Sequence, residues 1–367
     1  MEHVQSSSTL LTASGLIHGR LASGQRHALD AVGAGRGTLL IVGGPGTGKT
    51  TTLLNSVISR VRAGEALESL LIIAGSRFAA QRVRAQIVAG LGRSQLRPNV
   101  MTIHGLAQTV LRQLAEPGQP LPGLLTAPDQ EAALRDLLAA WPASRWPDEL
   151  RMAVPTRGFA TQLRALLART RQLGLDPAEL SQIGVVHDRP ELVTAGEFFA
   201  EYLDVLDARG VLDYAELIHR ARLAMTNSSA WQFAADLQTV YVDEFAELDR
   251  AQLQLVADVV RVGPGLVAFA DPTTSVFGFR GADQHAVAQF GTRFAGLRPA
   301  VEPRTIELTE QLRGMGRSSY LELVAANDAV SRRLGARLER IAGQPADAVS
   351  DAGEPDESEA SVRTIIA

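Results

Sequence analysis

The sequence predicts an α/β fold in which a parallel β-sheet carries helices on both faces and an all-helical segment is inserted into the chain. Three observations support this prediction. A glycine-rich loop lies between a strand-like run and a helix-like run, strand and helix patterns alternate from about Gln25 to Ala89, and two later strand-like runs each end in acidic residues. Such alternation is typical of a parallel sheet, and the long helical pattern between the early and late strands is the insertion.

The glycine-rich loop gives the strongest functional signal. It matches the phosphate-binding pattern G-x-x-x-x-G-K-[ST], with an apolar run before it and a helical pattern after it: Gly43, Gly44, Pro45, Gly46, Thr47, Gly48, Lys49, Thr50 and Thr51. Lys49 is the only lysine among 36 Lys and Arg residues, so one position keeps a compact ammonium that a planar guanidinium could not replace. We expect the loop and Lys49 to bind ATP phosphates and Thr50 to hold Mg²⁺, whereas the alternative is a chance glycine-rich turn.

Strand character returns at residues 240–242 and 265–270, and each run is followed by acidic residues. Ligands of an open parallel sheet bind at the carboxyl ends of the strands, so Asp243, Glu244 and Asp271 should emerge beside the phosphate loop. We expect Asp243 to hold Mg²⁺ and Glu244 to polarise an attacking water. Acidic pairs are also common at strand ends for purely structural reasons, which is the alternative interpretation.

Composition limits the class of protein. There is no cysteine, no apolar stretch approaches the roughly 20 residues that span a bilayer, and the net charge is −4. We therefore expect a cytoplasmic protein with no membrane partner. One basic region stands out, because the interval between Glu68 and Glu116 has no acidic residue and six arginines. It could follow a nucleic-acid backbone, or it could be a solvated helix face.

Two further features bear on ligands. Gln25 lies shortly before the loop and could read an adenine edge through its amide, or could simply cap a helix. The run from 270 to 282 contains Phe277, Phe279 and Arg280 on a glycine-rich loop. These side chains could stack on bases of a single strand, or they could pack between domains. Trp141 and Trp146, in the helical segment, are expected to be core residues rather than base-stacking platforms.

Together these motifs resemble those of superfamily 1A DNA helicases of the UvrD/Rep/PcrA type, over nearly everything from about 20 to 367. Details of the motifs resemble more closely the motor region of an AdnA-like helicase-nuclease subunit. By this resemblance Gln25 falls on the Q motif, Gly43 to Thr51 on motif I and Asp243-Glu244 on motif II. The residues placed on DNA-contacting motifs are Ser76, Arg77, Thr102, His104, Phe277, Phe279 and Arg280, and Arg313 falls on an arginine that reaches the γ-phosphate.

The resemblance implies a domain organisation. A loose tail would cover residues 1–15, and a RecA-like ATP-binding lobe (1A) residues 16–106 and 236–290. A helical insertion (1B) would cover residues 107–235, and the start of a second RecA-like lobe (2A) residues 291–367. The family's second lobe supplies an arginine that completes the ATP site. Since only its start is expected here, we expect the isolated chain to bind ATP and turn it over poorly.

The resemblance also implies a function, that of an ATP-dependent 3′-to-5′ DNA helicase or single-stranded DNA translocase in repair or recombination. Its partners would be single-stranded DNA, duplex DNA ends and a second helicase-nuclease subunit. The chain departs from the family pattern at Ala246, Glu247, Ala270 and Thr274, where the family has Gln, Asp, Gly and Gln. These departures leave a second hypothesis open, in which the chain is a non-motor subunit that binds nucleotide and DNA without coupling the two. A small-molecule kinase would fit the phosphate loop but not the helical insertion.

Overall fold

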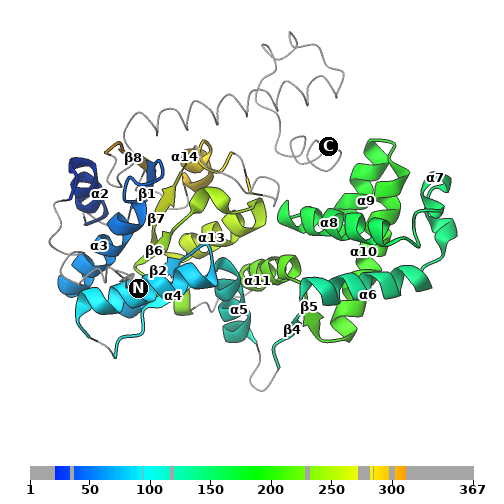
Figure 1. Cartoon of the computed structure of the whole chain (residues 1–367), viewed down its shortest axis with the longest axis horizontal. Helices are drawn as coiled ribbons and strands as arrows, with labels where there is room; N and C mark the ends of the chain where they lie inside the picture. Colours follow the sequence, from blue (N-terminus) through cyan, green and yellow to red (C-terminus); the bar gives the residue numbers. More distant parts are fainter. Residues whose placement is uncertain are drawn as a thin grey trace, which may run out of the picture. The chain divides into compact units, whose positions relative to one another are not determined.

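The computed structural model describes residues 21–33, 37–93, 95–115, 120–227, 232–271, 282–283, 285–296 and 302–310 (Figure 1). The chain divides into two compact units. The first comprises residues 1–106, 230–248 and 256–315, and the second comprises residues 107–229, 249–255 and 316–367. None of the helices described is both long enough and apolar enough to cross a membrane. Each unit is described by itself.

The first unit is built on a six-stranded sheet in the order β3-β2-β6-β7-β1-β8. Every neighbouring pair of these strands is parallel. The strands are β1 Thr38–Gly43, β2 Leu70–Ile73, β3 Asn99–Met101, β6 Thr239–Val242, β7 Gly265–Ala270 and β8 Arg304–Leu308. The predicted α/β class with a parallel sheet is therefore confirmed.

Both faces of the sheet are buried, as the unbroken apolar runs require. Leu39 and Ile41 of β1 belong to a core shared with α2, α3 and α4, while Leu40 between them is also buried. The helices of this unit are α2 Ser23–Gly33, α3 Lys49–Arg62, α4 Arg77–Leu91 and α14 Phe290–Phe294, with short α12 Gln232–Asp236 before β6. Two more, α5 Ile103–Leu114 and α13 Arg250–Val262, extend across the division between the units.

Local sequence accounts for where α4 begins and ends. The Ser76 hydroxyl accepts a hydrogen bond from the Ala79 N–H at 3.1 Å, which satisfies one of the free amides of the first turn. At the other end Gly92 adopts φ 66°, in the left-handed region, and its N–H bonds to the Val88 and Ala89 carbonyls. A glycine takes this helix-ending conformation without strain. The helix therefore starts at the carboxyl end of β2 and points its amides toward that edge of the sheet.

The strand β8 differs from the predicted organisation. It lies in residues 291–367, where the sequence led us to expect the start of a second lobe, yet Leu39 to Gly43 pair with Arg304 to Leu308 in the sheet of the first unit. Ile306 and Leu308 are buried in the core of that unit. We therefore propose that any boundary between lobes lies beyond Leu308. The expected tail at 1–15 lies outside the described residues.

The second unit is mainly helical. Its helices are α6 Ala127–Ala140, α7 Asp148–Arg151, α8 Arg157–Gln172, α9 Pro177–Val186, α10 Pro190–Ala208 and α11 Tyr214–Asn227. A single apolar core joins α6, α8, α9 and α10, and both Trp141 and Trp146 are buried in it, as expected. Trp141 packs edge-on against Phe198 and Trp146 packs edge-on against Phe159. Neither indole is free to stack on a base.

Two short strands interrupt the segment that was expected to be all helical. β4 Gly123–Leu124 and β5 Val211–Leu212 form a two-stranded parallel pair. The Gly123 N–H bonds to the Gly210 carbonyl and the Leu125 N–H to the Leu212 carbonyl, each at 2.9 Å. The two connecting segments satisfy their backbone groups on each other, because backbone polar groups need partners where the chain is covered. No periodic pattern predicts strands of this length.

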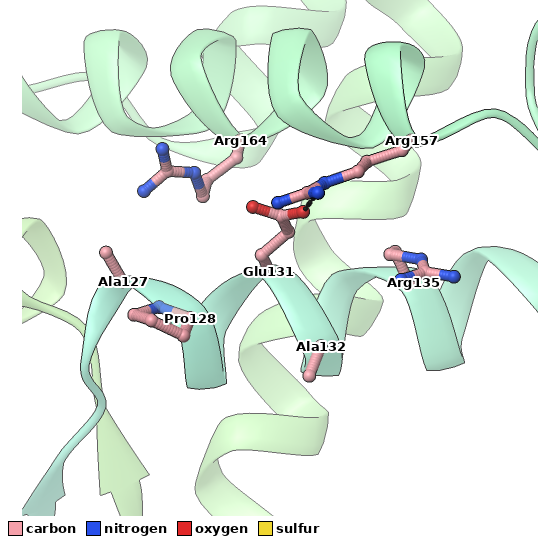
Figure 2. A pocket seen from close by; sticks show the side chains of 7 residues that line it. All are labelled: Ala127, Pro128, Glu131, Ala132, Arg135, Arg157 and Arg164. Atoms are coloured by element: carbon pink, nitrogen blue, oxygen red, sulfur yellow. Dashed lines mark hydrogen bonds and ion pairs between the residues drawn. The ribbon is translucent and has the colours of Figure 1, made fainter.

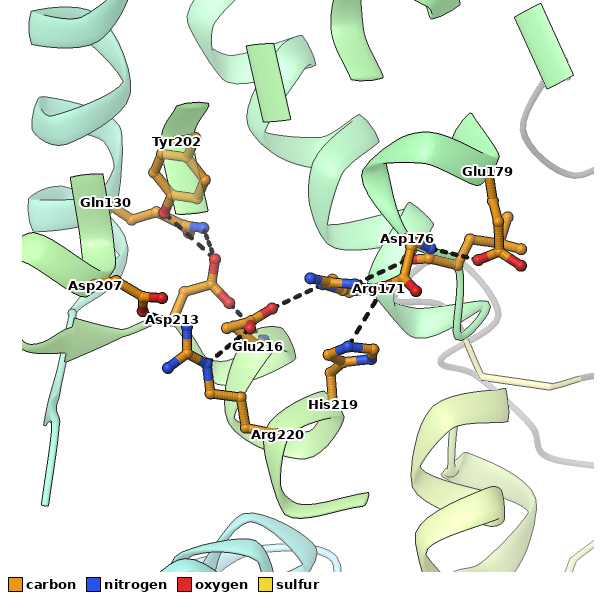
Figure 3. Close-up of polar contacts among 11 residues, drawn as sticks. Gln130, Arg171, Asp176, Glu179, Tyr202, Asp207, Asp213, Glu216, His219 and Arg220 are labelled. Atoms are coloured by element: carbon orange, nitrogen blue, oxygen red, sulfur yellow. Dashed lines mark hydrogen bonds and ion pairs between the residues drawn. The ribbon is translucent and has the colours of Figure 1, made fainter. Parts of the chain in front are cut away.

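A buried network of charged and polar side chains joins α8, α10 and α11 (Figure 3). Arg171 pairs with Glu216 at 2.7 Å, and both side chains are 4% exposed. Asp213 accepts hydrogen bonds from Gln130 at 2.9 Å and from the Tyr202 hydroxyl at 3.3 Å. Burial is the main cause that raises the pKa of Asp213. Because these buried polar groups satisfy one another, the members of the network depend on one another.

Candidate nucleotide site and nucleic-acid surface

The phosphate loop has the backbone conformation that its glycines predict. Gly46 and Gly48 have φ of 82° and 88°, in the left-handed region where a side chain would be strained. A Cβ at Gly43 would lie 2.5 Å from the Thr47 hydroxyl oxygen, so this position also needs glycine. The Thr47 hydroxyl donates to the Gly44 carbonyl at 2.8 Å and braces the turn from inside. Beyond Gly48 the chain enters α3, whose first amides face the loop.

The Lys49 ammonium lies inside this loop. Its Nζ donates to the Gly43 carbonyl at 2.5 Å and to the Gly44 carbonyl at 2.9 Å, and it pairs with Asp271 at 3.2 Å. All three partners are oxygen atoms. Phosphate oxygens can replace them, because an ammonium donates up to three hydrogen bonds and exchanges its acceptors easily. The predicted approach of Asp271 to the phosphate loop is therefore present in the structure.

Thr50 and Asp243 meet although 193 positions separate them in the sequence. The Thr50 hydroxyl donates to Asp243 Oδ2 at 3.2 Å, and Asp243 is 8% exposed. Burial, and then the neighbouring Glu244 carboxylate, raise the pKa of Asp243 to about 6, while the Thr50 hydrogen bond and the Lys49 charge oppose the shift. A hydroxyl and a carboxylate are oxygen donors that suit Mg²⁺, which usually keeps water and substrate phosphates as its other ligands.

No protein cage for a metal accompanies this pair. Across the described ranges there is no group of three or more His, Cys, Asp or Glu side chains that could hold an ion. The donor set therefore fits a cation that arrives with the phosphates of a nucleotide, not one held by the protein alone.

Glu244 has an unusual backbone. Its φ is 58° and its ψ 41°, in the left-handed region that is costly for a residue with a side chain. The exposed carboxylate extends over Gly75, where a Cβ would lie 1.8 Å from Glu244 Oε2. Backbone strain of this kind gathers at functional sites, so it supports a functional interpretation of Glu244.

Gln25 behaves as a bracing residue. Its side chain is 2% exposed, its Oε1 accepts from the Ala22 N–H at 3.1 Å, and its Nε2 donates to the Gly48 carbonyl at 3.4 Å. The first bond is the helix-capping role that the sequence left open. The second links the start of α2 to the phosphate loop. In this arrangement both ends of the amide are occupied within the protein, and an adenine would have to displace one of them.

Two residues predicted to contact DNA act as helix caps. The Ser76 hydroxyl caps α4, and the Thr102 hydroxyl accepts from the Gly105 N–H at 3.1 Å at the start of α5. Both lie just after strands, β2 and β3, that are neighbours in the sheet. The starts of α4 and α5 therefore lie along the same edge, where helix dipoles and free amides favour phosphate groups.

Arg77 and His104 are close enough to influence each other. Burial and then the positive charge of Arg77 lower the pKa of His104, so the imidazole is neutral at physiological pH. Arg77 is exposed in the first turn of α4. The remaining residues predicted to contact DNA, Phe277, Phe279 and Arg280, lie outside the described residues, and so does Arg313, which was predicted to reach the γ-phosphate.

Phe78 was not singled out from the sequence. Its side chain is 74% exposed in the first turn of α4, directly after Arg77. One turn further along the same face lies the exposed Arg82. Sequence reasoning missed Phe78 because an aromatic residue near a helix start is usually buried. The signal that could have found it is its position in the acid-free, arginine-rich interval.

Comparisons with known proteins agree with this geometry. A family model described as the UvrD/REP helicase N-terminal domain matches residues 24–295. DNA helicase II of Salmonella typhimurium is 25% identical over 332 residues, which cover 86% of this chain and 42% of that protein. ATP-dependent DNA helicase Rep of the same organism is 24% identical over 310 residues, which cover 81% and 42%.

A third relative comes from a multi-subunit enzyme. The RecBCD enzyme subunit RecB of Mycolicibacterium smegmatis is 27% identical over 298 residues, covering 67% of this chain and 26% of that subunit. The chain thus spans less than half the length of these curated relatives. Because the family model matches well over half of the chain, the chain belongs to the UvrD/REP helicase family and contains its N-terminal domain.

Proposed function

We propose that this chain is the ATP-binding motor region of a 3′-to-5′ DNA helicase or single-stranded DNA translocase that acts in repair or recombination. The observation that carries the proposal is the convergence of Lys49, Thr50 and Asp243, which come from two distant parts of the sequence and meet at one loop. Helicase names among the relatives and membership of the UvrD/REP family support DNA as the track. The polarity and the repair role rest on family resemblance alone.

Each residue of the proposed ATP site has a separate task. Backbone amides of the loop and of the first turn of α3 bind the β- and γ-phosphates, and Lys49 exchanges the Gly43 and Gly44 carbonyls for phosphate oxygens. Thr50 and Asp243 would hold Mg²⁺, which neutralises charge on the phosphates. Glu244, exposed at the end of β6, orients water for attack on the γ-phosphate.

The proposed DNA surface is the edge formed by the starts of α4 and α5. Arg77 and Arg82 supply positive charge for phosphates, and Phe78 offers an exposed ring on which a base can stack. Base stacking requires unpaired bases, so this surface favours a single strand. Gly75 directly precedes Ser76, and a Cβ at Gly75 would lie 1.8 Å from the Glu244 carboxylate. This closeness supports a DNA surface that begins beside the proposed catalytic base.

The test is ATP hydrolysis by the chain with and without single-stranded DNA, together with direct ATP binding. We expect Lys49→Ala to weaken ATP binding by about 2–3 kcal/mol, and Glu244→Gln to bind ATP normally while losing hydrolysis. Wild-type turnover in Glu244→Gln would refute the assignment of the catalytic base. If the wild-type chain showed no ATP binding, the proposal as a whole would fall.

A second candidate function is a non-motor subunit that binds ATP and DNA within a helicase-nuclease complex. Two positions that depart from the family pattern favour it: Ala246 and Ala270 are 5% and 0% exposed, so packed methyl groups stand there. The similarity to a subunit of the RecBCD enzyme is compatible with such an assembly. The two candidates separate on one measurement. A motor changes its DNA affinity when ATP binds, whereas a non-motor clamp binds DNA equally with and without ATP.

A further inference from the structure

A cavity in the helical unit has no role in the function proposed so far. It is an open cavity between α6 and α8 with a volume of about 420 Å³ (Figure 2). Its charged lining consists of Arg135 and Glu131 from α6 and Arg157 and Arg164 from α8. Small residues at the start of α6, Ala127, Pro128 and Ala132, leave the space open. The two helices otherwise pack against each other through the core of the unit.

The cavity is positively charged. Three guanidinium groups face one carboxylate, so the lining carries an excess of positive charge. The carboxylate is only partly engaged. Glu131 Oε1 accepts from Arg157 Nε at 2.8 Å, and the Arg157 side chain is 78% exposed. An ion pair so exposed contributes little to stability, and Arg157 can bind another anion at little cost.

Arg164 supplies the observation that points to a ligand. Its Nε is buried, and it has no hydrogen-bond partner within the described part of the chain. A buried cationic donor without an acceptor is costly, and native structures rarely leave one. Its guanidinium lies over the start of α6, beside Ala127 and Pro128 (Figure 2). An oxyanion in this gap would meet the Arg164 guanidinium, whose side chain is only half-buried.

The spacing of the cations distinguishes a linear polyanion from a single small ion. Arg157 and Arg164 are seven positions apart on α8, so they lie on one face about 10 Å apart. On α6, Arg135 is eight positions beyond Ala127, or about 12 Å along the axis. Figure 2 shows the three arginines spread along the gap between the helices, with the Arg157–Glu131 pair between the other two. Cations spread along both helices in this way suit a chain of phosphates.

We propose that the α6–α8 cavity is a phosphate-binding site, separate from the ATP site, that takes the phosphodiester backbone of a nucleic-acid strand. Phosphate oxyanions are the ligands that arginine binds with two parallel hydrogen bonds. The choice of a nucleic-acid strand over free phosphate rests on the proposed DNA function. The oxyanion chemistry itself rests only on the cavity, its charge and the unpartnered Arg164 nitrogen.

The test compares DNA affinity across salt concentrations for wild type, Arg135→Gln, Arg157→Gln and Arg164→Gln. Arg209→Gln is the matched control, because Arg209 is an exposed arginine of the same unit, outside the cavity. Each cavity variant should lower the slope of log affinity against log salt by about 1 and weaken binding about three- to tenfold near 0.1 M salt, while the control does neither. ATP binding should be unchanged in all four variants.

A substitution with the opposite sign excludes misfolding as an explanation. Glu131→Gln removes the only carboxylate of the cavity and should strengthen DNA binding several-fold, which a damaged protein would not do. Unchanged slopes in all three arginine variants would overturn binding of a strand. A second experiment adds inorganic phosphate alone and measures the change in the melting temperature of the protein. If phosphate stabilised wild type but not Arg164→Gln while the DNA slopes stayed unchanged, the site would take free phosphate and the strand assignment would be wrong.

Failure of this inference differs from failure of the proposed function. The Lys49→Ala experiment tests the ATP site of the first unit. The salt dependence of DNA affinity in the arginine variants tests the cavity of the second unit. Absence of ATP binding by the wild-type chain, with intact salt effects, would refute the motor proposal alone. Intact ATP binding with no salt effect and no phosphate effect would refute the cavity proposal alone.

Discussion

Replacing Arg171 by methionine should destabilise the helical unit strongly. The guanidinium pairs with Glu216 at 2.7 Å and Asp176 at 2.6 Å, donates to the Leu175 carbonyl at 3.1 Å, and lies 5.0 Å from the centre of the Phe199 ring. Methionine preserves most of the aliphatic volume. What is lost is therefore the charge and its hydrogen bonds, not the packing.

The size of the destabilisation depends on which ion-pair partners Glu216 retains in the variant. Removing one partner of a buried ion pair typically costs about 3–5 kcal/mol, because the other charge is left uncompensated. Glu216 is 4% exposed, yet it retains a second partner, Arg220, at 2.9 Å. We therefore expect the lower end, about 3 kcal/mol. In a unit of this size that corresponds to a fall in melting temperature of roughly 6–12 °C.

The assay is urea unfolding followed by tryptophan fluorescence, since Trp141 and Trp146 lie in the core of the same unit. Arg157→Met is the control, because Arg157 lies in the same unit. It also pairs with a carboxylate, Glu131, at 2.8 Å, but its side chain is 78% exposed and the substitution should cost less than about 1 kcal/mol. If Arg171→Met cost no more than Arg157→Met, the reasoning about burial would be refuted.

Other predictions test the two units separately. Lys49→Ala should weaken ATP binding by about 2–3 kcal/mol, the value of hydrogen bonds from a charged donor, and a calorimetric titration that gave wild-type affinity would contradict this. Phe78→Trp should show fluorescence quenching when single-stranded DNA is added but not when duplex DNA is added, and equal quenching by duplex would count against stacking. Phe78→Ala should lose about 1–3 kcal/mol of binding free energy for single-stranded DNA. Gly184→Ala should cost about 1–3 kcal/mol in urea unfolding, because its Cβ would lie 2.6 Å from a backbone nitrogen of α10. Burial, with the charge of Arg171, lowers the pKa of His219 to about 4, so the unfolded chain takes up a proton at this histidine before the folded chain does. Relative to His219→Gln, wild type should therefore lose up to about 3 kcal/mol of unfolding free energy as the pH falls from about 6.5 to 4. Parallel curves of unfolding free energy against pH for the two proteins would refute this prediction.

The nucleotide site was predictable because its signals are local. The loop from Gly43 to Thr51 specifies its own shape, since the glycines allow positive φ and the single lysine follows them at fixed spacing. The parallel topology then brings Asp243 and Asp271 to the same edge. In the strand order, β7 lies between β6 and β1, so the acidic residues after β6 and β7 both end near the start of α3.

What the sequence could not give depends on partners far along the chain. The amide of Gln25 could have faced a ligand or the protein, and only the fold shows that Gly48 lies within reach of it. The pairing of strand β8 with β1 depends on sheet order, which no local pattern encodes. The charge network around Arg171 was missed for the same reason: its acidic partner Glu216 lies 45 positions away and looks like a surface residue in the sequence.

The two hydroxyl residues predicted to contact DNA also have a structural role. Ser76 and Thr102 each follow a strand and cap the next helix through the side-chain oxygen. A capped helix start presents its remaining amides in a fixed direction, and that direction is the carboxyl edge of the sheet. The residues that cap these helices would therefore also set where a phosphate backbone is bound. Structural and functional constraints on Ser76 and Thr102 coincide, so replacing either by alanine would alter both the helix and the surface, and only a substitution that preserves the cap, such as aspartate, separates the two.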